Sequence, residues 1–96
     1  MSPKNKIELN KLRRKLDILD KDLLKIIKKR SELVKKVLSL KVYKKEIVDK
    51  KRITNILKKI RKQSINKNID PKITQRIWKN MIWSYIDYEK RNFKKK

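Results

Sequence analysis

The sequence predicts an all-α protein made of three helices: one long, one short and one of medium length. Three observations support this fold class. Apolar residues recur at steps of three and four along most of the chain, no segment shows strand-like alternation, and no Gly interrupts the pattern. The pattern contains no internal repeat. We therefore expect residues 1–96 to form one domain whose core covers about residues 7–92.

The long helix is expected from about Ile7 to Tyr43, after a polar lead-in at residues 1–6. Its apolar residues form one seam: Leu12, Leu16, Leu19, Leu23, Ile26, Leu33, Val37 and Leu40. Such a helix would be about 55 Å long, which exceeds the width of a compact domain of this size. The residues that follow are too few to cover its seam, so a second copy of the chain is the expected cover. A helix broken at residues 28–29 is the alternative, but no breaker residue supports it.

The second helix follows a short connector at residues 44–48. Asp49 is a plausible N-cap, and the helix is expected to end near Gln63. One face of this segment is apolar and contains Ile53, Ile56, Leu57 and Ile60.

The third helix follows a polar, loop-like stretch at residues 64–69. Asp70 and Pro71 form a clear start signal, because an acidic N-cap precedes Pro at the first helical position. The helix is expected to end near Arg91, and Glu89 continues its apolar side. The other residues of that side are Ile73, Ile77, Trp78, Met81, Ile82, Tyr85 and Ile86.

The composition excludes several kinds of chemistry. With no Cys and no His, the chain has neither thiolates nor imidazoles for nucleophilic, acid–base or metal-ligand roles, and without Gly it has no glycine-rich phosphate loop. The net charge is +22, which favours an anionic partner, but the abundance of Lys, Ile and Asn also fits a coding bias towards A and T. A polar start and the lack of a long apolar run predict a cytoplasmic protein without a membrane partner.

Four side chains are candidates for a binding site: Arg13, Arg30, Lys41 and Glu89. Arg30 occupies the seam where a leucine is expected, and a charge there requires an anion or an acidic side chain from a neighbouring helix. Lys41 lies about 16 Å further along the axis on nearly the same face, so Arg30 and Lys41 can bracket a small anion. Arg13 lies about 25 Å from Arg30 along the helix and can reach the same ligand only from a second chain.

The order and spacing of these residues resemble the all-helical class of chorismate mutase. The matching stretches are residues 12–24 (LRRKLDILDKDLL), Arg30 in KKRSELVKKV, Lys41, and the D-x-x-R pattern formed by Asp49 and Arg52. The resemblance covers roughly residues 7–92. Each motif alone is weak evidence for the family, whereas the order and spacing of all of them together are fairly strong evidence.

The resemblance implies an intertwined homodimer with two shared active sites that rearranges chorismate to prephenate, without cofactor or metal. It implies that Arg30 and the partner's Arg13 hold the two carboxylates of the substrate. Lys41 and Glu89 would donate to the ether oxygen, and Glu89 can donate only when protonated. The alternative for Glu89 is a helix-end carboxylate paired with Lys90 or Arg91.

Three departures from the family pattern concern the substrate site. Ile53 replaces the acid that often follows the D-x-x-R arginine, so Asp49 is left to help anchor the substrate hydroxyl region. Tyr85 aligns where a small hydroxyl residue is common, although Ser84 is adjacent and the register allows either. The connector also lacks the customary Gly and Pro. These departures do not alter the predicted fold, but they put the expected catalytic efficiency in doubt.

Three other functions remain open from the sequence. An isochorismate-pyruvate lyase would use a similar cationic pocket, and an inactive relative would serve to bind a partner enzyme. A basic helical module would bind nucleic acid, although the aromatic residues at helical spacing favour a core over stacking platforms, so nucleic acid is the less expected partner. Trp83 falls on the side of the third helix away from Glu89, where it would be exposed, meet another protein or pack in a dimer.

Overall fold

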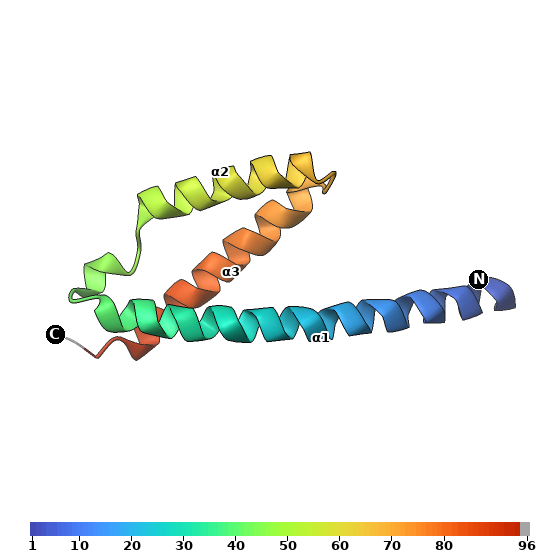
Figure 1. Ribbon diagram of the computed structural model, residues 1–96, viewed down its shortest axis with the longest axis horizontal. Helices are drawn as coiled ribbons and strands as arrows, with labels where there is room; N and C mark the ends of the chain where they lie inside the picture. Colours follow the sequence, from blue (N-terminus) through green and yellow to red (C-terminus); the bar gives the residue numbers. More distant parts are fainter. Residues whose placement is uncertain (95–96) are drawn as a thin grey trace. The chain divides into compact units, whose positions relative to one another are not determined.

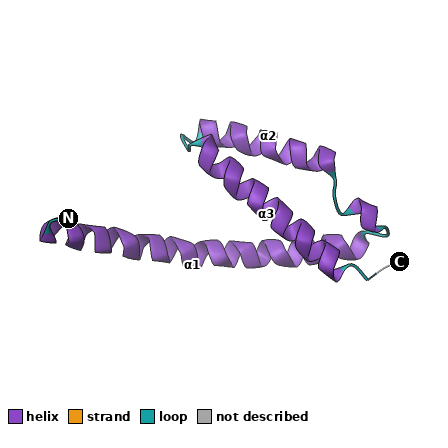
Figure 2. Cartoon of the chain, turned by 180° about the vertical axis from the view of Figure 1, so that it is seen from behind, coloured by secondary structure: helices purple, strands orange, loops and turns teal. Residues whose placement is uncertain are grey.

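The computed structural model describes residues 1–94 and confirms the all-α prediction. The elements are the α-helices α1 (Pro3–Leu40), α2 (Lys50–Asn66) and α3 (Pro71–Asn92), with a 3-10 turn η1 (Lys44–Glu46) between α1 and α2 (Figure 1). Figure 2 shows helices joined by short loops, and no strand occurs within residues 1–94. None of the helices in this range is both long enough and apolar enough to cross a bilayer.

Helix α1 begins and ends earlier than the apolar pattern indicates. It starts at Pro3 instead of Ile7, because Pro suits the first helical position and the Ser2 hydroxyl accepts the backbone N–H of Asn5 at 3.2 Å. It ends at Leu40 instead of Tyr43. Apolar periodicity does not record such end signals, so the predicted lead-in at residues 1–6 was wrong from Pro3 onward.

Helix α2 begins where the sequence indicates and continues further than expected. The Asp49 carboxylate accepts the backbone N–H of Arg52 at 3.0 Å, which confirms the N-cap. The predicted end at Gln63 was wrong, because the Ser64 hydroxyl donates to the Ile60 carbonyl at 2.6 Å and remains inside the helix. The expected loop at 64–69 is therefore reduced to residues 67–70.

The turn between α2 and α3 is built without glycine. Asn68 adopts a left-handed conformation with φ 58°, which Asn tolerates better than most residues, and the Ile69 N–H donates to the Ser64 carbonyl at 2.8 Å. Helix α3 then begins at Pro71 as predicted, with the Asp70 carboxylate accepting the Lys72 N–H at 2.9 Å. It ends at Asn92, one residue beyond the predicted Arg91.

The chain divides into two compact units, residues 1–33 and 34–96. The second unit contains the buried core, formed by Ile47, Ile82 and Ile86. Partly buried residues packed against this core are Val48, Ile53, Ile56, Leu57, Trp78 and Phe93. Helix α1 has no buried residue, and within the first unit Leu12, Leu16 and Leu19 are 55%, 57% and 61% exposed.

Two hydroxyl groups join α2 to α3 inside the second unit. Ser64 is 3% exposed, and its Oγ lies 2.7 Å from Oγ1 of Thr74, which is 9% exposed. Gln75 adds a second link, because its side-chain amide donates to the Leu57 carbonyl at 2.9 Å. These bonds fix the two helices side by side.

Replacing Ser64→Ala should lower the free energy of unfolding by about 1 kcal/mol, because the Thr74 hydroxyl loses its short hydrogen bond in a buried position. Ser84→Ala is a matched control, since the exposed Ser84 hydroxyl makes the same bond to a carbonyl one turn earlier, that of Asn80 at 2.7 Å. It should change stability by less than about 0.5 kcal/mol. Urea unfolding followed by circular dichroism measures both values. Equal effects of the two substitutions would contradict a special contribution from the buried pair.

Candidate active site

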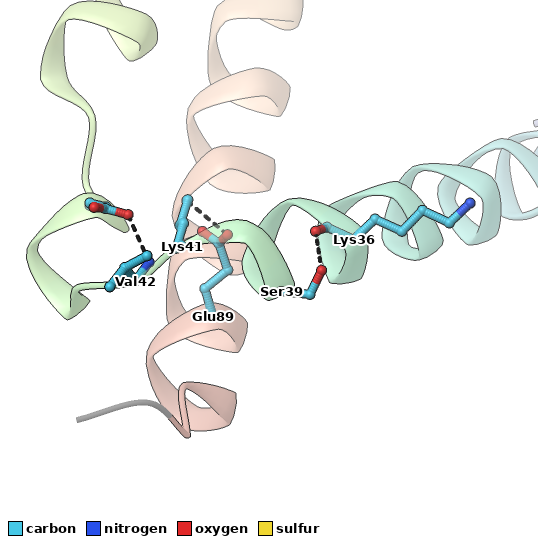
Figure 3. Close-up of polar contacts among 6 residues, drawn as sticks. Lys36, Ser39, Lys41, Val42 and Glu89 are labelled. Carbon is cyan, nitrogen blue, oxygen red and sulfur yellow. Dashed lines mark hydrogen bonds and ion pairs between the residues drawn. The ribbon is translucent and has the colours of Figure 1, made fainter.

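The second unit brings together two of the predicted site residues. Lys41 Nζ and Glu89 Oε1 lie 2.9 Å apart and form an ion pair (Figure 3). Their side chains are 18% and 7% exposed, whereas the side chains of the Lys11–Glu8 and Arg91–Asp87 pairs are more than half exposed. The lysine follows the last residue of α1, and the glutamate lies near the end of α3, 48 residues later. Glu89 therefore pairs with Lys41, and not with Lys90 or Arg91 at its own helix end, which was the alternative.

The connector after α1 determines where Lys41 lies. Lys41 is the first residue beyond the helix, and its N–H donates to the Leu38 carbonyl at 3.1 Å. The next N–H, that of Val42, donates to Oε2 of Glu46 at 3.0 Å, a contact drawn in Figure 3. Ile47 follows directly and is 3% exposed in the core. The Glu46 carboxylate and the buried Ile47 thus hold the backbone that follows Lys41 in place. The sequence did not predict this role of Glu46.

The helical register of α3 determines where Glu89 lies. Ile82 and Ile86 are seven and three residues earlier, and all three side chains share the buried face of the helix. Arg91 pairs instead with Asp87, at 2.8 Å on the exposed side. A carboxylate on this apolar face is costly without a cation, and Lys41 supplies one.

The ion pair leaves hydrogen-bonding capacity on the lysine. An ammonium group has three N–H donors, and Glu89 accepts one of them. The remaining donors are available to a ligand oxygen, in a site where partial burial strengthens electrostatic interactions. The arrangement is suited to binding an anionic molecule and to stabilising negative charge that develops on an oxygen.

The two candidate arginines lie on α1 within the first unit. Arg13 is exposed and Arg30 is half-buried. Both belong to one continuous helix, so they are about 25 Å apart along its axis. One small anion cannot contact both guanidinium groups of the same chain.

The remaining candidates flank the start of α2 and the middle of α3. Asp49 uses its carboxylate to cap α2, and the Arg52 side chain is exposed. Ile53 packs against the core and offers no hydrogen bond. Tyr85 is half-buried one turn before Glu89, whereas Ser84 is exposed and bonds to its own helix. The inward position one turn before Glu89 is therefore occupied by the tyrosine.

A metal centre has no candidate ligands in the described part of the chain, since residues 1–94 contain no group of three or more acidic side chains near one another.

The relationship of the chain to known proteins follows from the match of its sequence to a family model. The model for chorismate mutase type II matches residues 12–90. The chain belongs to the chorismate mutase type II family. No curated protein and no solved structure matches the chain significantly.

Membership in the chorismate mutase type II family fits the all-α fold, and the match spans every candidate residue from Arg13 to Glu89. The matched region also contains both partners of the partly buried ion pair. The family is one of isomerases, and its name identifies chorismate as the substrate class.

Proposed function

We propose that this protein rearranges chorismate to prephenate and serves phenylalanine and tyrosine synthesis in the cytoplasm. The observation that carries the proposal is the Lys41–Glu89 ion pair, which lies inside the region matched by the chorismate mutase model. The reaction is unimolecular: an ether C–O bond breaks while a new C–C bond forms in the same molecule. The enzyme needs to hold the folded substrate and stabilise charge on the ether oxygen, and side-chain cations are sufficient for both tasks.

Lys41 is proposed to act on the breaking bond. Negative charge accumulates on the ether oxygen as its bond to carbon lengthens, and the Lys41 ammonium group donates to that oxygen with an N–H that Glu89 does not use. The interaction is stronger in the transition state than in the ground state, because the oxygen becomes more negative. Asp49, Arg52 and Tyr85 are proposed as further substrate contacts around this centre.

Glu89 is proposed to donate to the same oxygen when it carries a proton. In the ion pair with Lys41 the carboxylate accepts, so it must gain a proton before it can donate.

Replacing Glu89→Gln should retain activity, because an amide donates a hydrogen bond without first gaining a proton. Glu89→Ala removes the donor and should lower kcat by about 10²-fold. Initial rates of chorismate loss measure both effects. An equal loss of kcat in Glu89→Gln and Glu89→Ala would contradict the donor role.

The active site is proposed to be completed by a second chain. The exposed leucines of α1 form an apolar stripe that needs a cover, and each fully buried leucine contributes about 1.5–3 kcal/mol. A second chain lying antiparallel brings its Arg13 towards the Arg30 end of the first helix. Arg30 and the partner's Arg13 then hold one carboxylate each, which accounts for two arginines that are too far apart to act within one chain.

The direct test is a product assay with purified protein. Chorismate should be consumed and prephenate formed in equal amount, which acid conversion to phenylpyruvate detects by its absorbance. Isochorismate is supplied in parallel, because release of pyruvate from it would indicate the lyase reaction instead. Absence of turnover of both substrates by a folded protein would reject the enzymatic proposal.

A further inference from the structure

The outward face of α2 differs in charge from the rest of the chain. Lys or Arg occupies positions 50, 51, 52, 58, 59, 61 and 62, and no Asp or Glu occurs from Lys50 to Asn66. Helix α1 has the same lysine-rich composition but contains acidic residues at positions 8, 17, 20, 22 and 32. A coding bias acts on both helices, so it does not account for the difference between them.

Four polar residues form a straight row on the side of α2 away from the core. This row, the α2 basic row, consists of Lys51, Asn55, Lys58 and Lys62, all exposed. Their spacing of four, three and four residues places them on one side of the helix. The opposite side contains Ile53, Ile56, Leu57 and Ile60, which are half-buried, and the buried Ser64.

Within residues 1–94, no lysine of this row forms an ion pair. The pairs Lys11–Glu8, Lys41–Glu89 and Arg91–Asp87 all lie outside α2. Asp49 and Asp70 lie just outside the helix, and their carboxylates accept backbone N–H groups at the starts of α2 and α3. The row therefore presents ammonium and amide donors without acidic competitors.

We infer that the α2 basic row binds the sugar–phosphate backbone of duplex nucleic acid, as a second function apart from chorismate chemistry. Along the helix axis the row spans about 16 Å, with gaps of about 10 Å and 6 Å between its lysines. A duplex carries one negative charge per about 1.7 Å of axis, so several phosphates fall within reach. Asn55 lies between two of the lysines and adds an amide donor for a phosphate oxygen.

The composition of α2 favours a duplex over a single strand. Proteins that hold single strands stack bases on aromatic side chains, and α2 contains no aromatic residue. A row of cations without aromatic side chains contacts phosphates and makes no contact with the base edges. Binding should therefore be independent of sequence and steeply dependent on salt.

The experiment compares two triple variants that lose the same charge. One is Lys51→Gln, Lys58→Gln and Lys62→Gln in the row; the control is Lys4→Gln, Lys6→Gln and Lys15→Gln on α1, where all three side chains are also exposed. Fluorescence anisotropy with a labelled duplex of random sequence gives the affinity between about 50 and 200 mM KCl. Circular dichroism and chorismate turnover, which neither variant should change, confirm that both proteins are folded.

The row variant should bind the duplex at least about 10-fold more weakly than wild type, and its slope of log K against log salt should be shallower by up to about 3, one for each lost phosphate contact. The control should change affinity by less than about 3-fold. Equal losses in the two variants would overturn the inference, because they would indicate diffuse attraction by total charge. A single strand bound more tightly than the duplex, or anionic lipid vesicles that compete equally for the row, would also overturn it. Failure of the chorismate assay alone leaves this inference standing, because the binding measurement does not use the active site.

Discussion

Replacing Lys41→Ala is expected to reduce kcat for chorismate rearrangement by about 10³-fold, with a smaller change in KM. The ammonium group is the cation placed beside Glu89 and is proposed to meet the oxygen that gains charge in the transition state. A loss confined largely to kcat is the signature of an interaction made in the transition state. Steady-state rates of chorismate loss provide the measurement.

Two further proteins control for indirect effects of this substitution. Lys41→Ala leaves the Glu89 carboxylate mostly buried without its cation, which destabilises the fold by about 3 kcal/mol. The double variant Lys41→Ala with Glu89→Gln removes the buried charge as well, so it should be more stable than the single variant and equally inactive. Lys44→Ala removes an exposed cation from the same connector and should keep wild-type activity. A kcat within 10-fold of wild type for folded Lys41→Ala would reject the proposed role.

Mixing two inactive arginine variants is expected to restore about a quarter of the wild-type activity. In the proposed homodimer, Arg13→Ala and Arg30→Ala would each remove one of the two arginines that hold substrate carboxylates from every site, so each protein alone should lose about 10³-fold in kcat/KM. When the chains are unfolded together and refolded at equal amounts, about half of the dimers contain one chain of each kind. In those dimers one site carries both substitutions and the other carries neither.

This restoration distinguishes shared sites from sites within one chain. If Arg13 and Arg30 acted in one site formed by a single chain, no mixture would contain an intact site. Activity would then stay at the level of the single variants. The control mixes Arg30→Ala with Lys41→Ala, two residues proposed to act from the same chain, and it should recover no activity. Sedimentation velocity measures whether the refolded chains are dimers, as proposed.

The sequence predicted the helices well where a side chain marks a boundary. Asp49 and Asp70 cap α2 and α3 as expected, because the N-cap preference arises from one local hydrogen bond. Ser64 misled the prediction, since its hydroxyl bonds back to the Ile60 carbonyl and finds Thr74 on another helix. A residue that favours loops in isolation stays helical once a neighbouring helix satisfies it, and periodicity alone does not contain that information.

The site was predictable in part for a similar reason. Periodicity placed Glu89 on the apolar side of the third helix, and it is buried there. Lys41 was expected within a helix, but it lies just after Leu40, where Glu46 bonds to the Val42 N–H. That contact depends on the path of a loop, which has no repeating pattern in sequence. The register at Ser84 and Tyr85 likewise required the packed helix to show which side chain faces inward.

The Lys41–Glu89 contact also affects how strongly simple anions bind at Lys41 when no substrate is present. Since the ammonium group already faces a carboxylate at 2.9 Å, a chloride or bicarbonate ion has little unbalanced charge to approach there. In the proposed site, a substrate that also contacts the arginines would gain enough from several contacts at once to share the lysine with Glu89. We therefore expect chloride and other simple anions to be poor inhibitors of the proposed reaction.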